Sequence, residues 1–124
     1  MTTSIPVLML SGFLWALPTL LPAADLVMVE EPGCPWCARW TAEIGPIYPK
    51  TAEGRAVPLV RMDISEPALD GFALARRVNF TPTFLLVDDG REIDRIEGYP
   101  GEELFWWRLS AILNTHGFLE EDDP

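Results

Sequence analysis

The stretch EEPGCPWCARW, residues 30–40, contains both cysteines of the chain, Cys34 and Cys37, with Pro35 and Trp36 between them. Four consecutive apolar residues precede it within residues 25–30, as expected of a β-strand covered on both faces. Proline is well tolerated in the first turn of a helix. The pattern therefore predicts a strand, a turn at residues 33–35 and a helix that begins at the two cysteines.

An apolar stripe then recurs at the three- and four-residue spacing of a helix: Cys37, Trp40, Ile44 and Ile47 or Tyr48. We therefore expect Cys37 on the buried side of the helix. Cys34 is expected at the helix N-terminus, where free backbone N–H groups and the helix dipole favour a thiolate. Because Pro46 has no N–H to donate, regular helix is expected to kink or end there.

Two closely spaced cysteines can form a redox dithiol, half of a metal site or a structural disulfide. Zinc needs four protein ligands, or three with a water, and the chain adds only one histidine, His116. A copper site would need soft ligands near the cysteines, of which only Met28 and Met62 lie on suitable strands. A disulfide that closes so short a loop constrains the unfolded chain little. A redox dithiol is favoured, and we expect no metal or other cofactor.

The rest of the chain is predicted to alternate short strands and helices. We expect a strand at residues 56–64, a helix at residues 67–78 capped by Ser65, and strands at residues 83–87 and 92–97 joined by a tight turn at Asp89 and Gly90. A broad apolar face predicts a last helix at residues 101–114. The order βαβαββα implies an α/β fold with a mixed four-stranded sheet and helices on both faces.

Composition limits the classes of partner. The 124 residues suffice for one domain, and nine Lys and Arg oppose nineteen Asp and Glu, for a net charge of −10. This balance argues against nucleic acid and anionic lipid surfaces as partners. Residues 118–124 are expected to form a solvated acidic tail.

The first 24 residues differ from the remainder. Residues 5–24, IPVLMLSGFLWALPTLLPAA, carry no charge and end in small residues, as a secretory signal with its cleavage site would. The absence of Lys and Arg before this run, and its three prolines, fit a signal less well. We expect export to the periplasm with cleavage of residues 1–24; an uncleaved apolar anchor and a cytosolic start are the alternatives.

Three segments together resemble the thioredoxin-fold oxidoreductases: EEPGCPWCARW, FTPTFLLVDDGRE (residues 80–92) and IEGYPGEEL (residues 96–104). The resemblance covers residues 25–117 and implies a thioredoxin-like domain. It further implies that Pro82 is a cis-proline beside the cysteines and that the backbone of Thr81 pairs with an extended substrate segment. Gly98, with the two residues after it, would form the other wall of the groove, and Pro35 and Trp36 would contact the partner.

By the same resemblance, Cys34 is the nucleophile and Cys37 the resolving thiol. Thioredoxins carry a buried aspartate on the strand before the motif, and Met28 occupies that position. Glu30 or Glu31 could take up the proton of Cys37 instead, or both could be solvent-exposed acids without that role.

More narrowly, the chain resembles the periplasmic thioredoxin-like proteins of the bacterial sulfur-oxidation (Sox) system. This implies an exported thiol-disulfide oxidoreductase that reduces or isomerises disulfides of partner proteins and keeps a sulfur-carrier protein active, with a membrane thiol reductase as electron donor. The alternatives are an oxidant of the same fold that donates its disulfide, and a non-catalytic adaptor or copper-binding module.

Overall fold

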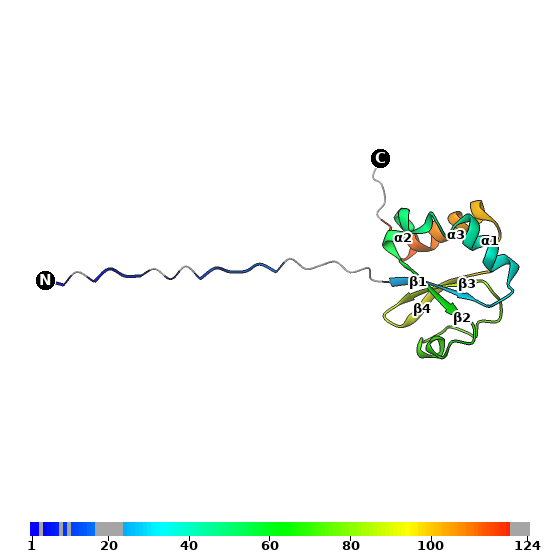
Figure 1. Cartoon of the computed structure of the whole chain (residues 1–124), viewed down its shortest axis with the longest axis horizontal. Helices are drawn as coiled ribbons and strands as arrows, with labels where there is room; N and C mark the ends of the chain where they lie inside the picture. The colour runs from blue at the N-terminus through cyan, green and yellow to red at the C-terminus, as the bar shows by residue number, and fades with distance from the viewer. Residues whose placement is uncertain (3, 8, 10, 17–23, 120–124) are drawn as a thin grey trace.

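The computed structural model describes all residues except 3, 8, 10, 17–23 and 120–124 (Figure 1). Its elements, with η for 3₁₀-helices, are β1 (Ala24–Glu30), α1 (Pro35–Glu43), η1 (Tyr48–Lys50), α2 (Ala52–Ala56), β2 (Leu59–Asp63), η2 (Pro67–Gly71), β3 (Thr83–Asp88), β4 (Arg91–Glu97) and α3 (Glu102–Thr115). The strands form one sheet in the order β2-β1-β3-β4. β1 is parallel to β2 and antiparallel to β3, and β3 is antiparallel to β4. The predicted α/β fold with a mixed four-stranded sheet is confirmed.

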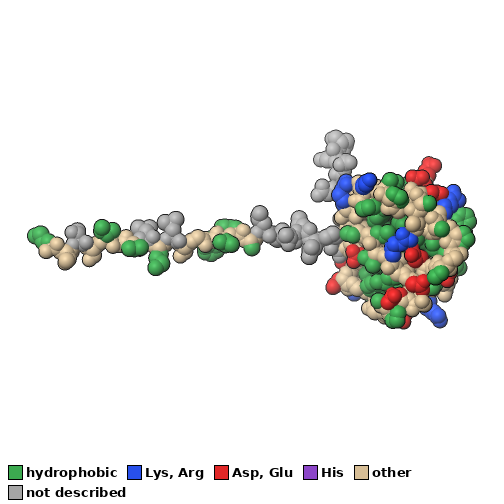
Figure 2. Space-filling model, viewed as in Figure 1, with side chains coloured by type: hydrophobic (Ala, Val, Ile, Leu, Met, Phe, Trp, Pro, Cys, Tyr) green, Lys and Arg blue, Asp and Glu red, His purple; other side chains and the backbone are tan. Residues whose placement is uncertain are grey.

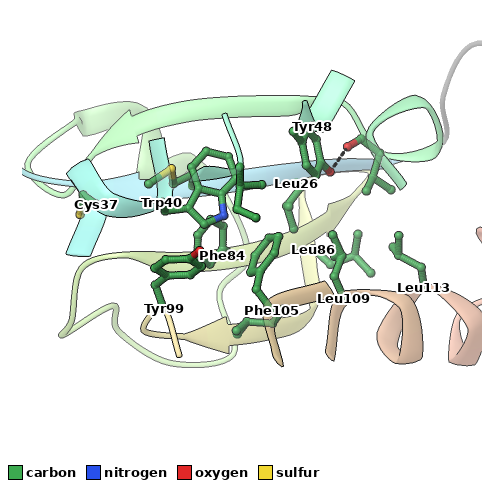
Figure 3. Packing of buried hydrophobic residues seen from close by; sticks show 14 of the residues in the cluster. Leu26, Cys37, Trp40, Tyr48, Phe84, Leu86, Tyr99, Phe105, Leu109 and Leu113 are labelled. Atoms are coloured by element: carbon green, nitrogen blue, oxygen red, sulfur yellow. Dashed lines mark hydrogen bonds between the residues drawn. The ribbon is translucent and has the colours of Figure 1, made fainter. Parts of the chain in front are cut away.

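Three α-helices cover one face of the sheet (Figure 1). Between them and the sheet lies an aromatic core in which Trp40 from α1, Phe84 from β3 and Phe105 from α3 are all fully buried. Their ring centroids lie between 5.0 and 5.8 Å apart (Figure 3), within the range in which aromatic pairs attract one another. This packing fixes α1, and with it the two cysteines, against the sheet.

The opposite face is covered without an α-helix. The predicted helix at residues 67–78 is wrong: only η2 is helical, its N-cap is Glu66 rather than Ser65, and Phe72 is already extended. Ala73 instead pairs with the edge of β4, donating its N–H to the Gly90 carbonyl oxygen at 2.8 Å. Pairing with the sheet has overridden the helical preference of the sequence that follows.

The connection between α1 and β2 also differs from the prediction. α1 ends at Glu43, before Pro46, and two short helices, η1 and α2, precede the strand. The Thr51 side chain accepts a hydrogen bond from the Gly54 N–H and so caps α2. β2 therefore begins at Leu59 and not at residue 56.

The hairpin between β3 and β4 turns at Asp89 and Gly90, as predicted. Both residues have positive φ, 50° and 74°, as a type I′ turn requires. The hairpin places Thr83, the first residue of β3, opposite Glu97, the last residue of β4.

The described residues among 1–16 form neither helix nor strand, and their side chains are exposed (Figure 2). Within the described residues, no helix has the length and apolar character needed to cross a membrane. Most of the predicted cleavage region and residues 120–124 of the acidic tail lie outside the described part of the chain.

Candidate functional site

The two cysteines lie where β1 gives way to α1. Gly33 has a φ of 77°, a conformation that favours glycine, and turns the chain from the strand into the helix. Cys34 is the N-cap residue of α1 and Pro35 its first helical residue, so the helix begins at the motif as predicted. The Cys34 sulfur accepts a hydrogen bond from the Cys37 backbone N–H at 3.1 Å. The first cysteine therefore lies directly against the positive end of the helix dipole.

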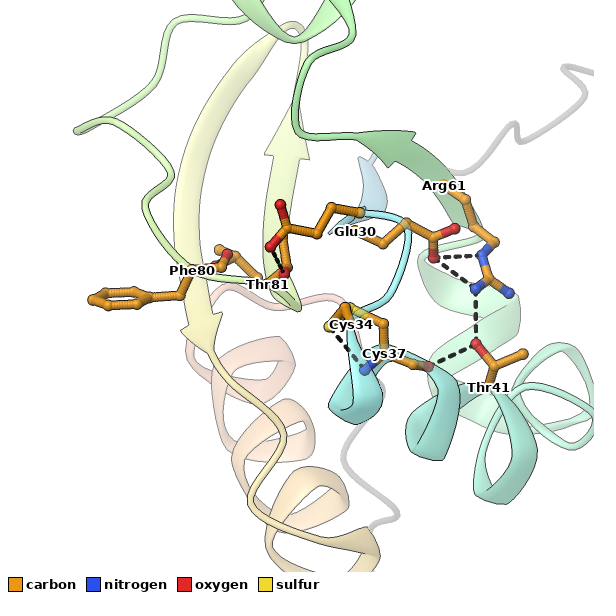
Figure 4. Close-up of a disulfide and its surroundings, with 9 residues drawn as sticks. Glu30, Cys34, Cys37, Thr41, Arg61, Phe80 and Thr81 are labelled. Carbon is orange, nitrogen blue, oxygen red and sulfur yellow. Dashed lines mark hydrogen bonds and ion pairs between the residues drawn. A yellow bond between two sulfur atoms is a disulfide. The ribbon is translucent and has the colours of Figure 1, made fainter.

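Cys34 and Cys37 are joined in a disulfide with their Cα atoms 5.3 Å apart. The two sulfurs have different surroundings. Cys37 is only 5% exposed and belongs to the aromatic core, whereas Cys34 is half-buried at the surface (Figure 4). An incoming sulfur atom can approach Cys34 from solvent more readily than Cys37.

The loop before β3 lies beside the disulfide (Figure 4). The Thr81–Pro82 peptide bond is cis, and the Gly98 N–H donates to the Pro82 carbonyl oxygen at 2.8 Å. The Thr81 hydroxyl donates to Glu31 Oε1 at 2.7 Å, which ties this loop to the turn before Cys34. Phe80, 59% exposed, points outward from the same loop. Thr81 thus lies beside the disulfide, and Gly98 is bonded to the residue that follows Thr81.

The structure separates Glu30 from Glu31. Glu30 Oε2 accepts hydrogen bonds from Arg61 Nε and Nη2, at 2.9 and 2.6 Å. Arg61 Nη2 also donates to the Thr41 hydroxyl, which donates to the Cys37 carbonyl oxygen (Figure 4). Glu30 is therefore connected to the turn of α1 that carries Cys37, whereas Glu31 is bonded to Thr81. Met28, which is expected at the position of the thioredoxin aspartate, is fully buried.

A cavity of about 590 Å³ opens beside the disulfide. It is bordered by both cysteines, both glutamates, Thr41 and Arg61. Within the described residues, no group of three or more His, Cys, Asp or Glu side chains is arranged to hold a metal ion. His116 Nε2 lies 3.1 Å from Asp94 Oδ2.

Trp36 is 52% exposed between the cysteines. The guanidinium carbon of Arg39 lies 5.7 Å from the centre of its indole, within cation–π distance. Arg39 also pairs with Glu43, which accepts a hydrogen bond from the Tyr99 hydroxyl at 2.5 Å. The Tyr99 bond and the Arg39 guanidinium lower the pKa of Glu43 below its ordinary value. These contacts connect the residue between the cysteines to the loop that contains Gly98.

Sequence reasoning missed several residues of this site. Arg61 was visible as a cation between the apolar residues Val60 and Met62 of a predicted strand. Because β1 and β2 are parallel, Arg61 pairs in register with Met28 and lies on the same face as Glu30. Thr41 and Glu43 carried no such signal, since the bonds that link them to Arg61 and Tyr99 join residues distant in sequence. Phe80 carried none either.

These features define the class of protein. A thioredoxin-like domain matches residues 25–113, and the chain belongs to this family. Comparison with curated proteins finds no match.

Among solved structures, the chain is similar to the periplasmic thioredoxin SoxS from Paracoccus pantotrophus in its reduced form, with 49% sequence identity and a TM-score of 0.72. The match covers 75% of this chain and 98% of that one. Thioredoxins from Fasciola hepatica and Malassezia sympodialis are each 20% identical to this chain, with TM-scores of 0.52 and 0.51. Both matches cover 73% of this chain, and they cover 81% of the Fasciola chain and 75% of the Malassezia chain. These two support the fold alone.

Proposed function

We propose that this protein is an exported thiol-disulfide oxidoreductase that reduces or isomerises disulfides of partner proteins through Cys34 and Cys37. The observation that carries the proposal is the asymmetry of the pair. Cys34 caps α1 at the surface and accepts the Cys37 N–H, whereas Cys37 is buried. A helix N-terminus stabilises a thiolate, the form of a cysteine that attacks a disulfide.

In the reducing direction, the Cys34 thiolate attacks one sulfur of the partner disulfide. A mixed disulfide forms, and the other partner sulfur leaves as a thiolate. Cys37 then loses its proton and attacks the Cys34 sulfur, which forms the intramolecular disulfide and releases the second partner thiolate. Two electrons have passed to the partner, and the two thiols of this protein have become its disulfide.

Thr81, Pro82 and Gly98 form the groove that receives the partner. No backbone hydrogen bond joins Thr81 to another described residue, so its N–H and C=O groups are free to pair with an extended segment of the partner. Pro35 and the exposed ring of Trp36 add contacts on the side of the helix.

Glu30, rather than Glu31, takes up the proton of Cys37. Through Arg61 and Thr41 it is connected to the Cys37 carbonyl oxygen, whereas Glu31 is bonded to the Thr81 hydroxyl. In Glu30→Gln the resolution of a mixed disulfide should slow and its pH dependence should change, whereas Glu31→Gln serves as the matched control. Equal effects of the two variants would refute this assignment.

The similarity to a periplasmic thioredoxin supports action in the periplasm. There the protein would keep a sulfur-carrier protein of sulfur oxidation in its active, reduced form and would be reduced again by a membrane thiol reductase. A reductant in an oxidising compartment needs such a supply of electrons.

The decisive experiment is trapping in the native compartment. Cys37→Ser should accumulate mixed disulfides through Cys34, because the resolving sulfur is absent, and mass spectrometry would identify the partners. Cys34→Ser is the matched control and should trap none. If the parent protein reduces disulfides and Cys34→Ser does so equally well, Cys34 is not the nucleophile. A reduction potential well above that of typical thioredoxins, about −270 mV, would instead indicate a disulfide donor.

A further inference from the structure

A β-bulge in β4 places two charged side chains on one face of the sheet. In a regular strand, residues three apart point to opposite faces. The register between β3 and β4 shifts so that Ile93 has no partner, Glu92 lies opposite Val87, and Arg95 lies opposite Leu85. Val87 and Leu85 belong to the aliphatic cluster on the face that lacks an α-helix. Glu92 and Arg95 therefore both lie on that face, where bulges commonly redirect side chains.

The two side chains form a buried ion pair. Arg95 donates from Nε to Glu92 Oε2 at 2.8 Å and from Nη2 to Oε1 at 2.5 Å. Their side chains are only 5% and 2% exposed. A buried pair of this kind is tolerated only when further hydrogen bonds satisfy its remaining atoms.

Those further bonds go to the backbone of residues 75–77. Arg95 donates to the carbonyl oxygens of Arg76 and Arg77, at 2.8 and 3.3 Å, and Glu92 Oε1 accepts the N–H of Ala75 at 3.3 Å. Buried backbone groups need partners, and this stretch has no helix to supply them. The ion pair therefore supplies residues 75–77 with backbone hydrogen bonds that a helix would have formed within itself.

Three residues after Arg77 the chain reaches Phe80, which with Thr81 belongs to the loop beside the disulfide (Figure 4). The far end of this short stretch is also anchored: the Thr83 hydroxyl donates to the Phe80 carbonyl oxygen at 2.8 Å, and the Thr81 hydroxyl is bonded to Glu31. Residues 78–82 thus lie between two fixed points, the ion pair and the start of β3.

We propose that Glu92 and Arg95 are positioning residues for partner binding: by holding residues 75–77, they set the place of Phe80 and Thr81 beside the disulfide. The inference rests on the proposed function. The ion pair would affect the binding of a protein partner but not the reactivity of Cys34 and Cys37. Ordering a loop in advance lowers the cost of binding to it.

Three variants test this role. Arg95→Lys keeps a positive charge beside Glu92 but loses the planar fork that reaches two carbonyl groups. The double variant Glu92→Gln with Arg95→Met removes both charges, so that no buried charge is left unpaired. Arg91→Met is the matched control, since Arg91 is an exposed residue of the same strand whose side chain makes no hydrogen bond or ion pair with other described residues. Circular dichroism establishes which variants are folded, and Arg95→Lys alone is decisive if the double variant is not.

The assay compares a protein disulfide, insulin, reduced with dithiothreitol as the electron source, with a small aromatic disulfide, dithiobis(nitrobenzoate), which is mixed with protein that has been reduced beforehand and freed of dithiothreitol. We expect KM for insulin to rise about fivefold in Arg95→Lys and in the double variant, while kcat and the rate with the small disulfide stay within about twofold of the parent. Amide hydrogen exchange should become faster in residues 73–82. Arg91→Met should match the parent in every measurement.

Faster exchange in residues 73–82 with an unchanged KM for insulin would overturn the inference, as would an equal loss of activity toward both substrates. A parent protein that reduces neither substrate would instead overturn the proposed function, and the inference with it. An active parent with unaltered variants would overturn the inference alone.

Discussion

On one face of the sheet, three α-helices cover an aromatic core, whereas on the other face residues 64–80 contain no α-helix and cover a smaller aliphatic cluster. The helices satisfy most of their own backbone hydrogen bonds, and the buried residues between them and the sheet are hydrophobic. The second face also needs Glu92 and Arg95 to bond the backbone of the segment that covers it. A segment without regular structure can be ordered when side chains of a neighbouring strand take over the hydrogen bonds of a helix.

The largest expected effect lies on the aromatic face. Trp40→Ala should lower the free energy of unfolding by about 4 kcal/mol, because it removes a fully buried ring in contact with Phe84 and Phe105. Denaturant unfolding followed by circular dichroism measures the loss. The matched control is Trp107→Ala, since that indole is 68% exposed and should cost far less. Similar losses in the two variants would show that this face does not depend on the aromatic core.

The next effect lies on the opposite face. Arg95→Met should cost about 3 kcal/mol, because it leaves the Glu92 carboxylate buried without its partner. In the double variant Glu92→Gln with Arg95→Met, part of this loss should be recovered, since neither charge remains. Denaturant unfolding of the single and double variants gives the coupling energy. A double variant less stable than Arg95→Met would show that the charges themselves stabilise this face.

A smaller effect is expected at the loop that contains Gly98. Tyr99→Phe removes the hydroxyl that donates to Glu43 and should cost about 1 kcal/mol. Because this bond is the main cause of the lowered pKa of Glu43, that pKa should rise toward its ordinary value. NMR titration of the Glu43 carboxyl in the parent and in Tyr99→Phe measures the change. An unchanged pKa would mean that Arg39 alone sets it.

The smallest effect concerns pH and compares one carboxyl from each face. On the face covered by residues 64–80, a hydrogen bond from Arg76 and further contacts with Arg95 lower the pKa of Glu97. On the face covered by the α-helices, the pKa of Glu43 is lowered as well. A carboxyl with a lowered folded-state pKa adds stability above its unfolded pKa, and this stability is lost as pH falls through the folded value.

The parent should therefore lose stability as pH falls below about 5. Glu97→Gln and Glu43→Gln should each flatten part of this decline in urea midpoints measured across the range. A decline that is identical in the parent and in Glu97→Gln would show that the ion pairs of this carboxyl contribute nothing to the folded state.

The sequence predicted the elements of the helix-covered face better than those of the opposite face. The stripe through Cys37, Trp40 and Ile44, the tight turn at Asp89 and Gly90, and the apolar face of the last helix are local patterns, and each formed the expected element. The helix predicted at residues 67–78 failed because Ala73 pairs with the edge of β4. Spacing along one segment carries no information about such a distant partner.

By itself, the sequence determined the class of fold through the order of its predicted elements. It determined the position of Cys34 at a helix start and the burial of Cys37 because both depend on neighbours within a few residues. Only the tertiary structure decided which glutamate is connected by hydrogen bonds to the Cys37 backbone, since that depends on Arg61 from a parallel strand and Thr41 from the helix. It alone also decided that Glu92 and Arg95 share a face, because a single unpaired residue, Ile93, reverses the alternation that a regular strand would impose.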